Sequence, residues 1–132
     1  MALAGALIVL LFSSFLIVIG AFMSLKPTNA LGVLRHMGST PTIHFSELSV
    51  RFLVGAGVYI FAAQSRYTQA FQITGIFLMV TSLMIMCVPH RVHNGYSVWW
   101  ADRFPPALVR ALGLIPIALG MWLFAHVTAV IA

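Results

Sequence analysis

The sequence predicts an all-α integral membrane protein, a bundle of four antiparallel transmembrane helices with two short interfacial segments. Of its 132 residues, 61% are hydrophobic and 7% are charged, whereas a soluble domain carries about 25% charged residues. The hydrophobic residues form four long runs, and about 20 such residues cross a hydrocarbon core of about 30 Å as a helix. No internal repeat is evident, so residues 1–132 are interpreted as a single transmembrane domain.

The four spans are delimited by charges and prolines. The first lacks a preceding basic region and exceeds the apolar core of a signal peptide, so we expect a mature helix that ends before Lys26. Ser46 is the expected N-cap of the second span, with Glu47 in its first turn. Pro89 ends the third span, and Pro116 is expected to kink the fourth. The predicted spans are about residues 3–25, 46–63, 70–88 and 107–131.

The connections differ in length and composition. Residues 64–69 are so few that the second and third spans must form an antiparallel hairpin. The first connection, residues 26–45, predicts a short interfacial helix capped by Asn29 and ended by Gly38. The third connection, residues 89–106, contains aromatic residues that favour the headgroup layer, namely Tyr96, Trp99 and Trp100. Both long connections are therefore expected to lie on the membrane.

The distribution of basic residues predicts the orientation. The two long connections contain Lys26, Arg35, Arg91 and Arg103, whereas the short connection contains only Arg66. The positive-inside rule then places the long connections in the cytoplasm and both termini outside, in a bacterial inner membrane. The net charge of +5 sits in short loops beside apolar spans, which argues against nucleic acid and leaves membrane lipids as the partner. Cys87 is the single cysteine, so no internal disulfide forms.

A polar cluster is predicted at the cytoplasmic end of the second span. Glu47 and Arg51 have the (i, i+4) spacing of a helical ion pair with the acid first. Arg110 enters the fourth span at a similar depth and is expected to add a second guanidinium, with His44 nearby. The structural interpretation, in which the pair reduces the cost of burying Arg51, is favoured over a functional one because the pair lies near the interface.

The histidines raise the alternative of a metal site. His44, Glu47, His90 and His93 offer imidazole and carboxylate ligands of the kind that zinc or iron binds. However, Pro89 precedes His90 directly and no known zinc signature is present. We therefore predict no metal and no cofactor. Haem is disfavoured because His126 is the one histidine well inside a span and has no opposite axial partner.

The connection "KPTNALGVL" and the helix opening "SELSVRFLVGAG" resemble small four-helix membrane proteins of unknown function, broadly the DoxX-like group. The resemblance rests mainly on Glu47, Arg51 and Gly55 and on the layout of most of the chain. The stretch "HRVHNGYSVWWADRFPP" does not fit that pattern. The resemblance implies the four-helix fold and points to the same polar cluster, but it implies no specific chemistry.

Two classes of function follow from these features. The first is a non-catalytic accessory or assembly component of a membrane complex, because ionisable groups are few and glycines suit close helix contacts, with a membrane protein or a second copy as partner. The alternative is a small ligand-, lipid- or metal-dependent membrane enzyme with a cytoplasmic-face polar site. An ion pathway is disfavoured because no ionisable residue lies at the midplane of a span.

Overall fold

The computed structural model describes residues 2–132, which are almost entirely helical. The elements are α1 (Ala2–Leu25), α2 (Pro27–His36), α3 (Pro41–Phe61), the 3₁₀ helix η1 (Ala62–Gln64), α4 (Thr68–Met86), α5 (His90–Arg103), α6 (Pro106–Leu112) and α7 (Leu114–Ile131). Four stretches are long and apolar enough to cross a membrane, namely Ala2–Leu25, Pro41–Gln64, Thr68–Met86 and Pro106–Ile131. The chain is thus an all-α integral membrane protein, as predicted.

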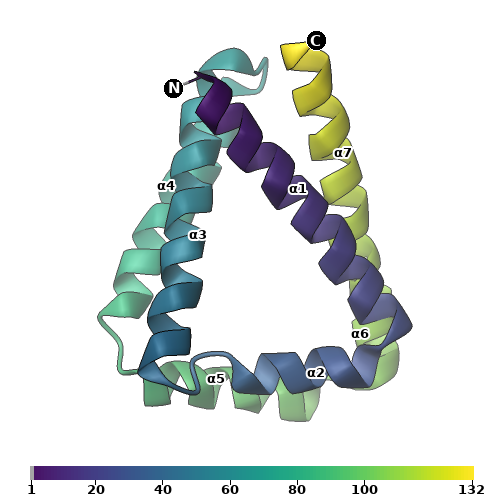
Figure 1. The fold of residues 1–132 in the computed structure, drawn as a ribbon. Coiled ribbons are helices and arrows are strands. Elements are labelled where there is room, and N and C mark those ends of the chain that lie inside the picture. The colour runs from purple at the N-terminus through teal and green to yellow at the C-terminus, as the bar shows by residue number, and fades with distance from the viewer. Residues whose placement is uncertain (1) are drawn as a thin grey trace.

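The spans are arranged as two antiparallel helix pairs, α3 with α4 and α1 with α7 (Figure 1). The pairs meet at the end of the molecule that holds both termini, where α1 packs against α3. They diverge toward the other end, where α2 and α5 lie across the molecule as its base (Figure 1). We call α2 and α5 together the interfacial platform. Its two helices belong to the two connections that were expected to lie on the membrane.

Glycines set the spacing between the packed spans. A Cβ at Gly75 of α4 would lie 2.7 Å from the Gly55 carbonyl of α3, and a Cβ at Gly20 of α1 would lie 2.5 Å from the Gly113 carbonyl. Where α1 crosses α3, a Cβ at Gly57 would lie 2.2 Å from the Ile8 side chain. Any larger residue would push these helices apart, which is the role that small residues have in membrane helix packing.

Two buried apolar clusters divide the core. The larger lies near the termini and joins α1, α3, α4 and α7 around Val9, Phe61 and Val127. The smaller lies at the platform and joins Leu31 of α2, Ala101 of α5 and Val109 of α6. Each end of the molecule therefore has its own set of packed side chains, and α5 and α6 are tied to the smaller one.

The start of α3 differs from the prediction. The helix begins at Pro41, with Thr40 as N-cap accepting a hydrogen bond from the Ile43 amide at 3.1 Å. Ser46 is exposed inside the helix, so its predicted capping role is wrong, and Glu47 lies in the second turn rather than the first. A threonine cap followed by proline at the first helical position is a helix start in its own right.

The interfacial segments and the fourth span also show where the sequence signals act. Helix α2 begins at Pro27, so Asn29 is not its cap, although the predicted stop at Gly38 has a φ of 71° just past the helix end. Pro89 is the N-cap of α5 and therefore precedes the helix, which runs without a break from His90 to Arg103. The fourth span is interrupted at Gly113. In this turn Pro116 has no N–H to donate to the carbonyl four residues before it, that of Leu112.

A candidate polar site between the platform and the spans

Two histidines from different elements meet where the platform joins α3. His44 on α3 is only 1% exposed, and its Nδ1 lies 2.8 Å from Nδ1 of His93 on α5. The ring centroids are 5.0 Å apart with an interplanar angle of 62°. A nitrogen–nitrogen contact of this length requires one N–H donor and one lone-pair acceptor. A single hydrogen therefore lies between the two Nδ1 atoms.

Further along the same face of α3 lie Glu47 and Arg51. Nη2 of Arg51 donates to Thr81 Oγ1 of α4 at 2.9 Å, while Nε of Arg51 and Oε2 of Glu47 are buried with no hydrogen-bond partner among residues 2–132. Nε2 of His44 is buried and unpartnered in the same way. Such atoms are few in a native structure, so these three mark this part of α3 as a candidate site.

The turn between α2 and α3 covers this cluster and depends on Gly38. The Gly38 carbonyl lies 3.3 Å from Nδ1 of His90. A Cβ added to Gly38 would lie 2.7 Å from Nδ1 of His93. Asn94 secures the turn by donating from Nδ2 to the carbonyls of Arg35 at 2.8 Å and Met37 at 2.9 Å. The start of α5 thus positions His93 and also holds the turn between α2 and α3 in place.

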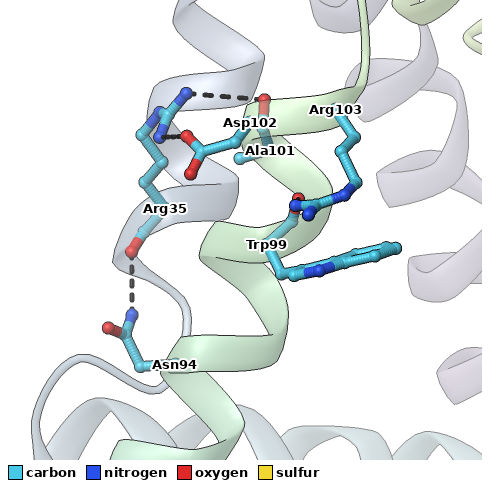
Figure 2. Close-up of polar contacts among 6 residues, drawn as sticks. All are labelled: Arg35, Asn94, Trp99, Ala101, Asp102 and Arg103. Atoms are coloured by element: carbon cyan, nitrogen blue, oxygen red, sulfur yellow. Dashed lines mark hydrogen bonds and ion pairs between the residues drawn. The ribbon is translucent and has the colours of Figure 1, made fainter.

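The other half of the platform is braced at its surface. Arg35 of α2 forms an ion pair with Asp102 of α5, and its second guanidinium nitrogen approaches the Ala101 carbonyl (Figure 2). Arg103 lies with its guanidinium 3.6 Å above the Trp99 ring (Figure 2), a cation–π arrangement. The Arg35 contacts join the same two helices as the Asn94 bonds, at the C-terminal end of α2, whereas the Arg103–Trp99 contact lies within α5.

The electrostatics of the site act on His93. Burial, followed by the nearby His44 and Arg51, lowers the pKa of His93 below its ordinary value of about 6.5. The physical cause is that a second positive charge there would lose solvation and face other cations. His93 is therefore neutral at pH 7, which suits a ring that shares one hydrogen with His44.

The structure brings together only some of the residues predicted for this site. His44, Glu47 and Arg51 share one face of α3, and His93 joins them from α5. However, Glu47 and Arg51 form no ion pair within residues 2–132, because the guanidinium turns to Thr81 instead. The predicted local pair is thus corrected to a contact between α3 and α4.

Arg110 does not join the cluster. It is exposed on α6, a helix that packs against α1 and α2 rather than α3, and its carbonyl accepts a hydrogen bond from Ser24 of α1. The predicted second guanidinium beside Glu47 is therefore wrong.

The metal alternative also changes in detail. Of His44, Glu47, His90 and His93, the structure joins His44 directly to His93, while His90 contacts the Gly38 carbonyl. Within residues 2–132, no group of three or more His, Cys, Asp or Glu side chains is arranged to hold a metal ion.

A second polar contact, near the termini, was missed by the sequence reasoning. His126 on α7 has its Nε2 2.8 Å from Ser65 Oγ, and its ring is stacked on Trp122 at 5.1 Å and on Phe71 at 5.7 Å. The (i, i+4) spacing of Trp122 and His126 was a usable signal for the first stack. This contact ties α7 to the turn of the α3–α4 hairpin.

Two cavities lie away from the His44–His93 cluster. One, of about 210 Å³, is apolar and lies among α1, α2 and α6, with Phe22, Leu34 and Leu112 in its lining. The other is an open depression along residues 66–70. The cluster therefore does not face either of them.

Comparison of the chain with protein-family models, with functionally characterised proteins and with solved structures finds no match.

Proposed function

We propose that this integral membrane protein is a non-catalytic accessory or assembly component of a membrane complex. The observation that supports this most is the use of its polar side chains for bracing. Arg35, Asp102 and Asn94 connect α2 to α5, and the contact between His44 and His93 connects α5 to α3. None of these residues lines either of the two cavities described above, whereas catalytic groups ordinarily line a pocket.

The proposed partner surface is the outer face of α5. Val92, Tyr96 and Trp99 follow helical spacing and are 60%, 65% and 46% exposed, and Arg103 continues the row above the Trp99 ring. Aromatic and arginine side chains are the types that dominate protein interfaces. A membrane-protein subunit or a second copy of this chain fits such a surface, and lipid headgroups surround it.

We further propose that the protein resides in a bacterial inner membrane with the platform in the cytoplasm and both termini outside. The exposed basic side chains on the platform side support this orientation, since Lys26, Arg91, Arg103 and Arg110 are all exposed there. On the opposite side, the short turn after η1 contains Arg66. Excess basic residues favour the cytoplasmic face.

Purification in mild detergent, followed by mass spectrometry and size analysis, tests the accessory function. We expect at least one stoichiometric membrane subunit, or a dimer, to co-elute with the native chain and to be lost from the double variant Tyr96→Ala with Trp99→Ala. Phe15→Ala, an exposed aromatic residue on α1, is the matched control and should retain the assembly. A native chain that elutes alone as a monomer would contradict the proposal.

A second candidate is a small ligand-dependent membrane enzyme built on the cluster. It is favoured by the three buried, unpartnered atoms on His44, Glu47 and Arg51, which are compatible with a bound polar molecule. Metal analysis of the same purified protein tests its metal-dependent form. Near-equimolar metal that disappears in a His44→Ala variant would support this candidate over the accessory function.

A further inference from the structure

The contact between His44 and His93 has a property that depends on the number of protons it holds. With two neutral rings, or with one neutral and one protonated ring, one Nδ1 carries a hydrogen and the other accepts it. With both rings protonated, both Nδ1 atoms carry a hydrogen and point these at each other across 2.8 Å. The contact therefore tolerates at most one charged imidazole.

We propose that the His44–His93 pair is a proton-operated latch that fixes the interfacial helix α5 to the transmembrane helix α3. The proposal goes beyond an accessory role, because it concerns the position of the platform whether or not a partner binds. Both rings belong to the latch by geometry: His44 is 1% exposed, and Gly38 leaves the space in which His93 approaches it.

The charged and titratable neighbours of the pair come from each packed element. Helix α3 contributes Glu47 and Arg51, and α5 contributes His90, whose Nδ1 faces the Gly38 carbonyl. Helix α4 contributes the Thr81 hydroxyl that binds Arg51. On α2, His36 is exposed and has its Nδ1 2.9 Å from the Gly32 carbonyl, outside the pair.

These neighbours determine when the latch opens. Burial, His44 and Arg51 oppose a positive charge on His93 and lower its pKa, so the state with both rings charged is reached only in acid. Once both rings are charged, the direct contact between α3 and α5 is lost, while the Asn94 bonds still hold α5 to the preceding turn. The expected motion is a separation of α5 from α3 about that turn.

Pulsed electron spin resonance on the full chain in lipid nanodiscs tests the latch. Spin labels are attached through Ser49→Cys on α3 and Val92→Cys on α5, two exposed positions, in a Cys87→Ser background. We expect the distance between the labels to be constant from pH 8 to about 6.5, the ordinary pKa of histidine, and to lengthen only in more acidic solution, where both rings become charged.

Substitutions then assign the response to the pair. His93→Gln retains a hydrogen-bonding side chain without the titration and should abolish the change in distance, whereas His36→Gln should leave it intact. Should a variant fold poorly, imidazole ¹⁵N spectra of the native chain give the same answer, since two rings that share a hydrogen titrate in coupled steps. A distance independent of pH, a response that survives His93→Gln, or independent titration of His44 and His93 would each overturn the latch.

Discussion

Gly38 is the residue on which the turn between the platform and α3 depends. Its φ of 71° lies in the left-handed region, which costs a residue with a side chain about 1–2 kcal/mol. In addition, a Cβ at this position would come within 2.7 Å of His93 Nδ1 and 3.0 Å of the Asn94 amide. Backbone conformation and packing therefore both require glycine.

We expect Gly38→Ala to lower the free energy of unfolding by at least about 1–2 kcal/mol, measured by thermal unfolding in detergent. The matched control is Gly32→Ala in α2, where a Cβ would meet open space. That change should stabilise the helix by about 0.5–1 kcal/mol, because alanine loses less backbone entropy than glycine. Equal stability of the two variants would contradict the described turn.

His93 should make stability depend on pH. Burial, His44 and Arg51 lower its pKa in the folded protein, so the unfolded chain, with a pKa of about 6.5, binds a proton first as the pH falls. The stability that neutral His93 contributes is fully present above about pH 6.5 and is lost as the pH falls through the folded-state pKa of His93. Unfolding midpoints from pH 8 to 5 should fall less steeply for His93→Gln than for the native chain. His36→Gln should keep the native slope.

At the scale of the elements, α2 and α5 act as one unit because several polar contacts and a shared apolar cluster join them. The contacts differ in strength. The Arg35–Asp102 pair has side chains that are 44% and 52% exposed, so water screens it and it contributes less than about 1 kcal/mol. The two Asn94 bonds satisfy the Arg35 carbonyl in the last turn of α2 and the Met37 carbonyl just past its end, and the bond to Met37 is partly buried.

This difference predicts the order of two substitutions in the platform. Asp102→Asn should lower the free energy of unfolding by less than about 1 kcal/mol. Asn94→Ala removes two hydrogen bonds of about 0.5–1.5 kcal/mol each and should cost about 1–3 kcal/mol. Thermal unfolding of both variants under identical detergent conditions measures the order. A larger loss for Asp102→Asn would show that the surface ion pair holds the platform.

At the scale of the whole molecule, the two helix pairs place every long polar connection at one end and both termini at the other (Figure 1). The pairs touch closely where Gly5 and Gly57 allow α1 to cross α3, and the platform spans the ends that diverge. A membrane protein of this shape exposes its platform to one compartment and the turn at residues 65–67 to the other.

Labelling of single cysteines tests the orientation. In a Cys87→Ser background, Arg35→Cys and Arg91→Cys should resist an impermeant thiol reagent in intact cells, because the basic residues favour a cytoplasmic platform. Arg66→Cys should be labelled under the same conditions. Labelling at positions 35 and 91 with protection at position 66 would invert the proposed topology.

The sequence by itself determined the four spans, the hairpin of α3 and α4, and the two interfacial segments. The physical reason is that a membrane span must satisfy its own backbone over a fixed length, so apolar runs and prolines are sufficient to locate it. The sequence also selected the face of α3 that contains His44, Glu47 and Arg51, because helical spacing is a local property. The start of α3 was misplaced because Ser46 and Thr40 are both capping residue types.

Only the tertiary structure decided which side chains meet. His44 and His93 are 49 residues apart in sequence, and Arg51 binds Thr81 on α4 rather than Glu47 one turn away. Arg110 lies on α6, which packs against α1 and α2 rather than against α3. Helical period fixes the direction of a side chain relative to its own axis, but the neighbour in that direction depends on how the helices pack. The glycine contacts and the turn at Gly38 set that packing.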